Sequence, residues 1–410
     1  MKINNLITHI ATGEADNSFV GIKIVGNHIH FYYPESYHFD KDNYERDDFL
    51  DLLKTISIAK SRSKTHTNAF NSRVNESDYA LLSYIWIIED FIKNGFSTNT
   101  EKVLKANQRG RINWKKTLQQ QPIISGSNII YTNLYAEIKS PRDTIISEAY
   151  RYCVRKSAAM IGWIYGISSA SIEVVPNAEK KTQRYLNAIK CELDSIFDDE
   201  KRSRLTHMEN VLIGLDEVSD DNSIVYGADS YHYIFERMIN AIFGTEPVDE
   251  YYPKYLWHLD YSPDKEKGLS GPTIRPDTIM KSDNDNIIII DSKFYRYGCL
   301  DLAQTKGLPE ASSIVKQITY GSHVQAERQN NSVYNAFILP YDSKSPNGDL
   351  IKEEDKKLVY IGYVCSNQDQ DKTYGRIHTF LIDLKYVVKT WNRILHKADQ
   401  KSLAEKIIPE

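Results

Sequence analysis

The chain has 410 residues, of which 41% are hydrophobic and 26% are charged, and its formal net charge at pH 7 is −4. This composition is typical of an ordinary soluble globular protein, and the length predicts two or three domains. No signal peptide or membrane-length apolar run is recognisable, and the four cysteines lack the spacing of zinc or redox sites. We therefore expect a cytoplasmic protein without a membrane partner.

The N-terminal segment predicts a hairpin followed by a helix. Two apolar runs, residues 19–25 and 29–34, are separated by a short polar turn, which is typical of two paired strands. Residues 46–59 carry apolar side chains at helical spacing. His28 and His30 alternate near the turn, so we interpret them as the polar exterior of the hairpin rather than as metal ligands.

A polar stretch over residues 60–75 is expected to be a loop, and residues 78–94 are expected to form a helix. Ser77 can cap the start of that helix, and Gly95 can end it. The two end signals agree with the apolar spacing between them.

Basic and aromatic side chains are clustered in residues 109–117. Such a cluster could contact phosphates and stack on a base, and the candidate DNA contacts are Arg109, Arg111, Trp114, Lys115 and Lys116. A solvated basic loop anchored by the tryptophan explains the pattern equally well. The acidic net charge does not exclude nucleic-acid binding, because phosphate contacts need only a local basic surface.

A strand is expected near residues 128–131, and a helix over 141–166 with a proline in its first turn. Residues from about 170 to 225 are mostly helical in pattern and highly charged, which favours a solvated connector between two globular halves. We therefore divide the chain into an N-terminal domain (1–168), a helical connector (169–225) and a C-terminal domain (226–410).

The C-terminal domain opens with a predicted helix over residues 231–243, which has one apolar face. Glu236 lies at the edge of that face, one position after Phe235. It could turn inward to complete a metal site, but exposed helix glutamates are more common, and the sequence alone favours exposure.

The stretch from Ile274 to Lys293 carries most of the recognisable chemistry. Four consecutive isoleucines, residues 287–290, indicate a strand that is buried on both faces. Asp291 and Lys293 follow, and alternation along the strand points both to one side and Ser292 to the other. Because buried charges are costly unless they are paired or bind a ligand, we expect Asp291 and Lys293 at the mouth of a site.

A polar turn over residues 282–286 is expected to fold Asp277 back toward Asp291 in a hairpin. Two carboxylates and a backbone carbonyl, which we assign to Ser292, form an oxygen site suited to Mg²⁺. Such an ion lowers the pKa of bound water and neutralises charge on a phosphodiester, while Lys293 can position the water or stabilise the phosphate. The pattern suggests a metal-dependent nuclease.

The remaining elements predict a mixed sheet flanked by helices, which places the chain in the α/β (α+β) class. They are a loop over residues 301–311, a helix over 313–321, strands at 333–339, 358–364 and 377–384, and a final helix over 384–396.

The spacing of Pro276-Asp277 and Asp291-Ser292-Lys293 resembles the PD-(D/E)xK nuclease superfamily. Further segments resemble the LlaJI-type restriction endonuclease family, whose nuclease part is related to McrC. These segments are residues 19–21, 90–95, 110–114, 235–238, 243–244, Trp257, 275–277, 291–295, 308–310 and 314–320.

The resemblance implies roles for individual residues. Asp277 and Asp291 would bind the metal, Lys293 would act on the water and the scissile phosphate, and Glu236 would complete the site. Gln317, with Lys316 beside it, falls where related nucleases carry a helical glutamine near the active centre. Relatives often have alanine at the position of Ser292, and because this side chain is expected to face away, we expect little consequence.

The resemblance also implies a PD-(D/E)xK restriction-endonuclease-like core in residues 226–410, preceded by an α+β N-terminal domain and the helical connector. The expected activity is magnesium-dependent hydrolysis of double-stranded DNA at specific sites, with the N-terminal half serving recognition or assembly. A homodimer and a cognate DNA methyltransferase are the expected partners.

Two other functions remain open. The chain could be a McrC-like nuclease subunit of a GTP-driven complex with a McrB-like GTPase, since it has no Gly-x-x-x-x-Gly-Lys-Ser/Thr loop of its own. It could also be a DNA-binding protein with an inactive nuclease fold, because fold alone does not establish function.

Overall fold

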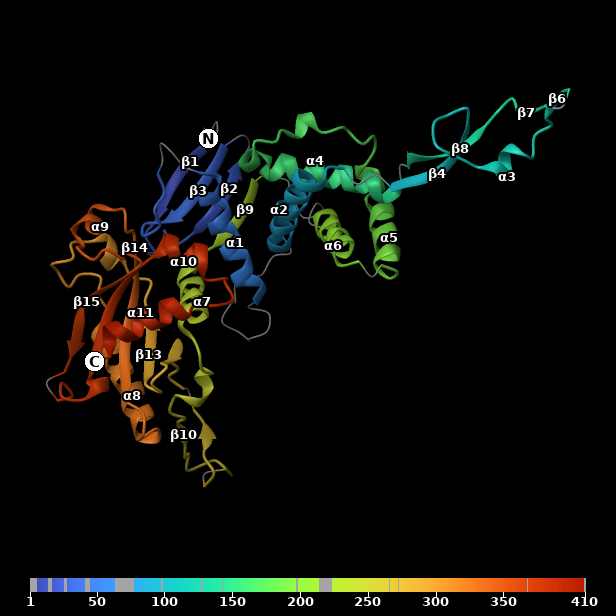
Figure 1. Ribbon diagram of the computed structural model, residues 1–410. Coiled ribbons are helices and arrows are strands. Elements are labelled where there is room, and N and C mark those ends of the chain that lie inside the picture. The colour runs from blue at the N-terminus through green and yellow to red at the C-terminus, as the bar shows by residue number, and fades with distance from the viewer. Residues whose placement is uncertain are drawn as a thin grey trace. The chain divides into compact units, whose positions relative to one another are not determined.

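The computed structural model describes residues 6–13, 17–25, 28–40, 45–62, 77–96, 99–126, 128–142, 144–196, 198–213, 223–264, 266–271, 273–366 and 368–408. The chain forms two compact units: unit 1 contains residues 1–72 and 221–410, and unit 2 contains residues 73–220 (Figure 1). None of the described helices is both long enough and apolar enough to cross a membrane.

The limits of the two units differ from the predicted domain limits near residues 168 and 225. The reason is a pairing between distant strands: β2 (Val20–Val25) runs antiparallel to β9 (Ser223–Ala228) along its whole length. This pairing joins the N-terminal strands to the C-terminal part of the chain. Local periodicity contains no information about such a pairing.

The first sheet of unit 1 has four strands in the order β1-β3-β2-β9, with β1 at Leu6–Ala11 and β3 at His28–Pro34. The predicted hairpin is confirmed as the antiparallel pair β2–β3. Phe31 on the inner face packs on Phe49 of α1 (Arg46–Arg62), with ring centroids 4.6 Å apart. The predicted loop at 60–75 lies mostly outside the described residues.

The second sheet of unit 1 is mixed and has the order β12-β13-β14-β16-β15. The predicted strands are confirmed, because β13 runs antiparallel to β12, parallel β14 and β16 follow, and β15 pairs antiparallel with β16. The five strands are β12 (Thr278–Lys281), β13 (Ile287–Ser292), β14 (Val333–Tyr341), β15 (Leu358–Cys365) and β16 (Arg376–Asp383). A two-stranded hairpin, β10 (Leu256–Trp257) and β11 (Leu269–Ser270), precedes this sheet in the chain.

The isoleucine run lies in β13, an inner strand of this sheet, and residues 287–290 are all buried. Ile287 and Ile289 pack with Tyr320 and Val324 of α8 (Ala311–Glu327). Helix α7 (Tyr231–Phe243) contacts β12 and β13, and its buried apolar face is the predicted one. Helices therefore flank the strand that carries Asp291.

The C-terminal helix differs from its prediction. The expected helix over 384–396 ends early, as α10 (Leu384–Thr390), and a second helix, α11 (Lys397–Ile407), follows. The buried Trp391 donates a hydrogen bond from Nε1 to Thr55 Oγ1 at 3.1 Å, so the chain turns into the core at the point where the helix was expected to continue. A short helix at Pro346–Leu350, α9, was not predicted.

Unit 2 is built on four helices: α2 (Ser77–Asn94), α4 (Ile145–Tyr165), α5 (Thr182–Leu193) and α6 (Asp199–Ile213). Helix α2 is confirmed, and it ends at Gly95, whose φ of 67° is the left-handed conformation that glycine favours. The predicted start of α4 is wrong, because Pro141 lies in strand β8. Thr144 and Ser147 form a capping box that begins the helix at Ile145.

Residues after 170 pack into unit 2 rather than form a solvated connector. Four apolar side chains of α6 are buried although the helix is rich in charge: Leu205, Met208, Val211 and Leu212. The buried Asp90 of α2 accepts two hydrogen bonds from Arg204 of α6, each 2.9 Å long, and a third from Tyr150 of α4. Burial alone would raise the pKa of Asp90, but these bonds outweigh burial and hold the pKa below its ordinary value.

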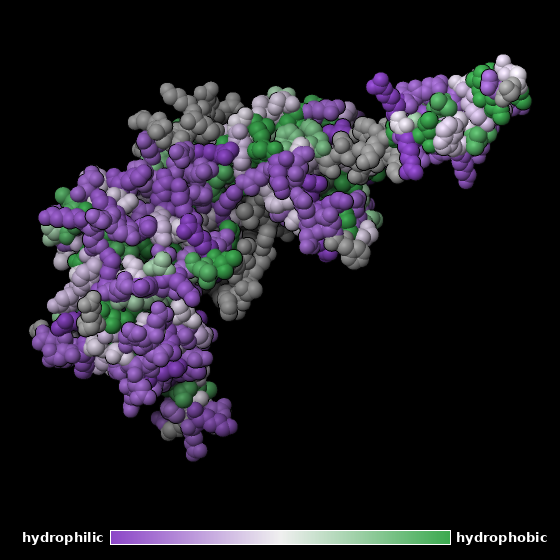
Figure 2. Space-filling view, viewed as in Figure 1, coloured by the Kyte–Doolittle hydropathy of each residue, from purple (hydrophilic) through white to green (hydrophobic). Residues whose placement is uncertain are grey.

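Residues 99–142 form an extension of unit 2, which we call the arm. Strands β4 (Asn99–Ala106) and β8 (Tyr135–Arg142) make a ribbon that also carries β5 (Arg111–Ile112) and α3 (Trp114–Thr117). Hairpin β6 (Ile123–Ser125) and β7 (Asn128–Ile130) lies at its far end, which confirms the strand expected near residue 128 (Figure 1). Four exposed isoleucines give this end the hydrophobic surface seen in Figure 2: Ile123, Ile124, Ile129 and Ile130.

Candidate active site

The β12–β13 hairpin brings Asp277 and Asp291 together. Asp277 directly precedes β12, Asp291 is in β13, and the antiparallel register pairs Thr278 with Ile290 between them. Burial raises the pKa of Asp277, and repulsion from Asp291 raises it further. Burial likewise raises the pKa of Asp291, although the neighbouring Lys293 opposes this shift. Two carboxylates that are this close disfavour the doubly charged state.

Lys293 forms the cationic part of the site. Its Nζ lies 2.8 Å from Asp291 Oδ2. Burial lowers the pKa of Lys293, but the charges of Asp291 and Asp277 and the nearby Tyr295 outweigh burial and raise it. Lys293 is therefore an ammonium ion at neutral pH and can stabilise negative charge, whereas it cannot act as a base.

Ser292 takes part in the site, contrary to the expectation that it would have little consequence. Its backbone N–H donates to Asp277 Oδ2 at 2.9 Å, and its Oγ donates to the same oxygen at 3.2 Å. Asp277 reaches back from the start of β12, and its carboxylate interacts with Asp291 as well. The hydroxyl therefore fixes the orientation of one carboxylate relative to the other.

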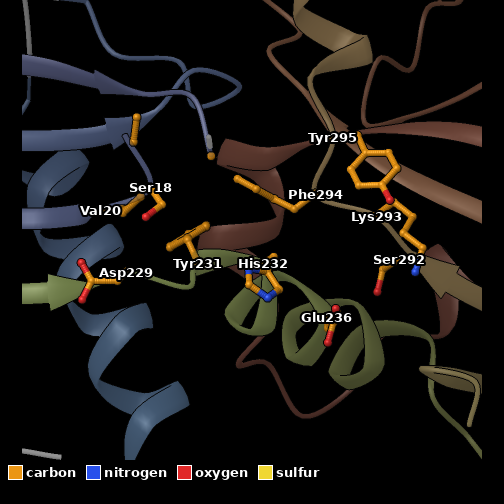
Figure 3. Close-up of a pocket in the computed structure, with 12 residues that line it drawn as sticks. Ser18, Val20, Asp229, Tyr231, His232, Glu236, Ser292, Lys293, Phe294 and Tyr295 are labelled. Carbon is orange, nitrogen blue, oxygen red and sulfur yellow. The ribbon is translucent and has the colours of Figure 1, made fainter. Parts of the chain in front are cut away.

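Glu236 lies closer to the acidic pair than the sequence suggested. Its side chain is partly buried on α7 and lines the same pocket as Lys293 (Figure 3). Burial, followed by repulsion from Asp277, raises its pKa to about 8, against the effect of Lys293. The interpretation as an ordinary exposed helix glutamate is wrong, because the side chain is in electrostatic contact with both aspartates.

Gln317 is fully buried under β13. Its Nε2 donates to the backbone carbonyl of Ile289 at 2.7 Å and lies 3.3 Å from Asn335 Oδ1. These contacts make it a support for the strand that carries Asp291. Lys316 beside it is exposed, and its charge acts on Asp291. Burial raises the pKa of Tyr320, one turn later on α8, and the charges of Asp291 and Asp277 raise it further.

The donor set suits Mg²⁺, which protein sites usually bind through one or two carboxylates together with water and substrate phosphate. The carboxylates of Asp277 and Asp291 offer two such oxygen donors. Burial raises both of their pKa values and repulsion from Asp291 adds to the shift of Asp277, so a cation beside them would favour their charged forms. Within the described ranges, no group of three or more His, Cys, Asp or Glu side chains could hold a metal ion.

A pocket of about 310 Å³ adjoins these residues within unit 1. Glu236, Ser292 and Lys293 line one part of it, and His232 and Tyr295 lie beside them (Figure 3). Burial and then the charge of Lys293 lower the pKa of His232. His232 was not predicted as a site residue, although it precedes Glu236 by four residues and so shares its side of the helix.

The five candidate DNA contacts are all on the arm of unit 2, whereas the carboxylates belong to unit 1. Trp114 is 56% exposed, so it does not anchor the basic stretch. The four basic side chains are exposed as well: Arg109, Arg111, Lys115 and Lys116. This exposure agrees with a contact surface and excludes the loop anchored by the tryptophan.

Comparisons with known proteins found a matching family and several similar solved chains, two of which follow. The family model for the LlaJI restriction endonuclease matches residues 19–365. No curated protein matches the chain significantly. A structure of Thermococcus gammatolerans McrB AAA+ hexamers with bound McrC is similar at 12% identity over 95% of this chain and 83% of that chain, with a TM-score of 0.39. A structure of the McrBC complex from the same organism is similar at 12% identity over 54% of this chain and 64% of that chain, with a TM-score of 0.20.

Proposed function

Because the chain belongs to the LlaJI restriction endonuclease family, we propose that it is a magnesium-dependent nuclease that hydrolyses phosphodiester bonds of double-stranded DNA at specific sites. The observation that carries this proposal is the group of Asp277, Asp291 and Lys293 at the end of a buried strand. Two carboxylates and an ammonium ion in this arrangement fit the PD-(D/E)xK type of active site.

Each residue has a distinct part in the proposed reaction. Asp277 and Asp291 would hold Mg²⁺, and Ser292 keeps the carboxylate of Asp277 in place through two hydrogen bonds. When bound, the ion supplies a water of lowered pKa and neutralises charge on the phosphate. Lys293, held as an ammonium ion by Asp291, orients the attacking water and stabilises the negative charge that develops on the phosphate.

Glu236 and Gln317 support this site. Glu236 lines the pocket, and above its raised pKa of about 8 its carboxylate can accept a proton from water that is bound near Asp277. Gln317 holds β13 through the carbonyl of Ile289, two residues before Asp291. Gln317 therefore acts on the carboxylates through the strand, whereas Glu236 would complete the metal site as the resemblance implies.

Cleavage of plasmid DNA is expected only when Mg²⁺ is present, and excess EDTA should abolish it. The half-saturating Mg²⁺ concentration should fall by about tenfold or more between about pH 6 and about pH 8.5, since protons and metal compete for the same carboxyls. The sign follows from the raised pKa values: below them the folded site favours protonated Asp277 and Glu236, and above them both are charged and attract the ion. A pH-independent Mg²⁺ requirement contradicts this assignment.

Replacing Ser292 with alanine should raise the half-saturating Mg²⁺ concentration by about tenfold, because losing a residue that orients a metal ligand typically weakens metal affinity tenfold to a hundredfold. The backbone hydrogen bond to Asp277 stays in place, so thermal unfolding should change little. Ser282→Ala, in the turn of the same hairpin, is the control. An unchanged Mg²⁺ requirement in Ser292→Ala would show that the hydroxyl does not orient Asp277.

The exposed end of the arm favours a second candidate function, that of a McrC-like nuclease subunit driven by a McrB-like GTPase. Four exposed isoleucines on one hairpin are an apolar patch of the kind that marks protein contacts. The same plasmid assay separates the two functions. Cutting at discrete sites by the purified chain supports the first, and cutting only after a GTPase partner and GTP are added supports the second.

The proposed activity also suggests which partners the chain has. Cutting both strands of a duplex is simplest with two active sites, so we propose a homodimer on DNA. A cognate DNA methyltransferase would protect the host's own sites from a site-specific nuclease. The exposed basic residues of the arm, together with Trp114, are the proposed duplex contacts.

A further inference from the structure

The pocket beside Lys293 has two chemically different ends. Lys293, Ser292 and Glu236 lie at the end next to the acidic pair, and Ser18 and Asp229 lie at the opposite end (Figure 3). The second end comes from the first sheet of unit 1, because Asp229 directly follows β9 and Ser18 precedes β2. The sheet that the N-terminal strands form therefore supplies one wall of the pocket.

The volume of the pocket limits what can enter it. At about 310 Å³ it is at the small end of the range of roughly 300–1,000 Å³ that is usual for ligand pockets. A duplex is too wide for such a space, whereas one nucleotide unit of a strand is of the appropriate size. An ammonium ion at one end suits a phosphate, and a carboxylate at the other end suits an N–H donor.

Two rings line the pocket next to Lys293. Tyr295 is 36% exposed, and its hydroxyl points toward Lys293 (Figure 3). His232 is exposed on the first turn of α7 and close enough to Lys293 to be affected by its charge. The ring of His232 also contacts that of Tyr233, with centroids 4.1 Å apart. Solvent-accessible rings of this kind can stack on nucleic-acid bases.

We propose that this pocket binds one deoxynucleotide of the DNA strand next to the scissile phosphate. His232 and Tyr295 contact the base, and the carboxylate of Asp229 accepts a hydrogen bond from an exocyclic amino group on it. Carboxylates recognise the amino group of cytosine in this way, and adenine and guanine carry comparable donors. Thymine has no exocyclic amino group, so the pocket discriminates against it. This inference rests on the proposed nuclease function, because it assigns the nucleotide to the same site.

Direct binding tests the pocket without any cleavage. The four deoxynucleoside 5′-monophosphates and inorganic phosphate are titrated into the full-length protein with Mg²⁺, and binding is followed by ligand-observed NMR. We expect dTMP to bind about tenfold more weakly than the three nucleotides with amino groups, and inorganic phosphate to bind more weakly still. Asp229→Ala should remove the difference between dTMP and the others, whereas the matched exposed variant Asp371→Ala should retain it.

Substitution of the rings should affect all four nucleotides alike. His232→Ala and Tyr295→Ala are each expected to weaken binding by about tenfold, the usual effect of removing one stacking partner. Equal binding of all four nucleotides, displacement of them by equimolar inorganic phosphate, or an unchanged preference in Asp229→Ala would overturn the proposal.

Cleavage provides the second test once the cut position is mapped. An abasic site is placed on either side of the scissile bond in a duplex that is otherwise intact. On one side of the scissile bond, the abasic site should slow cleavage by the wild type by about tenfold. In His232→Ala, which has already lost one ring, the same abasic site should slow cleavage by less than about twofold further. If the abasic site and His232→Ala reduce the cleavage rate independently, so that their effects multiply, the proposed base contact in the pocket is contradicted. Base-dependent nucleotide binding without any DNA cleavage would support the proposed pocket and refute the proposed nuclease function. Cleavage without base-dependent binding would support the nuclease function and refute the pocket.

Discussion

Replacing Asp291 with asparagine is expected to reduce Mg²⁺-dependent plasmid cleavage by about a thousandfold or more. The substitution preserves the shape of the side chain but removes the charge that we propose binds the metal and that pairs with Lys293 at 2.8 Å. Losing one preorganised electrostatic group typically costs a hundredfold to a thousandfold in rate, and here the metal and the lysine are both affected. Initial rates on supercoiled plasmid at saturating Mg²⁺ are the measurement.

A matched control separates this effect from misfolding. Asp283→Asn, in the exposed turn of the same hairpin, should cleave at the wild-type rate. Thermal unfolding of Asp291→Asn should not occur at a lower temperature than that of the wild type, because burial already disfavours the charged form of this carboxyl. Cleavage by folded Asp291→Asn within about tenfold of wild type would refute the assignment of the active site.

Replacing Arg204 with methionine is expected to destabilise unit 2 by about 3–5 kcal/mol, the usual cost of removing one partner of a buried ion pair. The variant leaves the carboxylate of Asp90 buried with only Tyr150 and Asn94 as donors. Urea unfolding followed by circular dichroism measures the effect. Met is close to Arg in length and keeps the packing of the aliphatic stem.

The double variant Asp90→Leu with Arg204→Met tests the cause. It should recover at least part of the lost stability, because no unpaired charge remains in the core. If the double variant is less stable than Arg204→Met, the loss of stability arises from packing and not from an unpaired charge. Arg202→Met, on the exposed side of the same helix, is the control and should change stability by less than about 0.5 kcal/mol.

The same network determines how unit 2 responds to acid. The folded-state pKa of Asp90 is below its ordinary value, so its contribution to stability is fully present above the pKa of the unfolded chain, about 3.9. The contribution is lost as the pH falls through the lower folded-state pKa. Stability arising from Asp90 should therefore be constant at neutral pH and should decline only in strong acid.

The central hairpin could be predicted from sequence because its signals are local. Four isoleucines define a buried strand, the polar run 282–286 defines a turn, and the short span forces Asp277 and Asp291 to meet. Alternation along β13 could not show that the carboxylate of Asp277 comes within hydrogen-bond distance of Ser292, and so the hydrogen bonds from Ser292 were missed.

Features that depend on distant segments were not predictable in this way. The pairing of β2 with β9 joins residues about two hundred positions apart, and nothing in either strand specifies the other. The burial of α6 was hidden by its many charged residues, since charges on the solvent side dominate the composition of the helix. The exposure of Glu236 was predicted wrongly for a related reason. The charged side chains near it, Asp277, Asp291 and Lys293, come from a different part of the sequence.

The long insertion of unit 2 between β3 and β9 has a consequence for biosynthesis. A ribosome releases all of residues 73–220 before it makes β9, the strand that completes the first sheet of unit 1. Since domains generally fold as units while they emerge, unit 2 can fold while β1, β2 and β3 still lack their fourth strand. During this interval the edge of β2 has unpaired backbone groups that can pair with another chain. A chaperone that covers this edge, or a change in the rate of synthesis at this stage, would therefore affect the yield of folded protein.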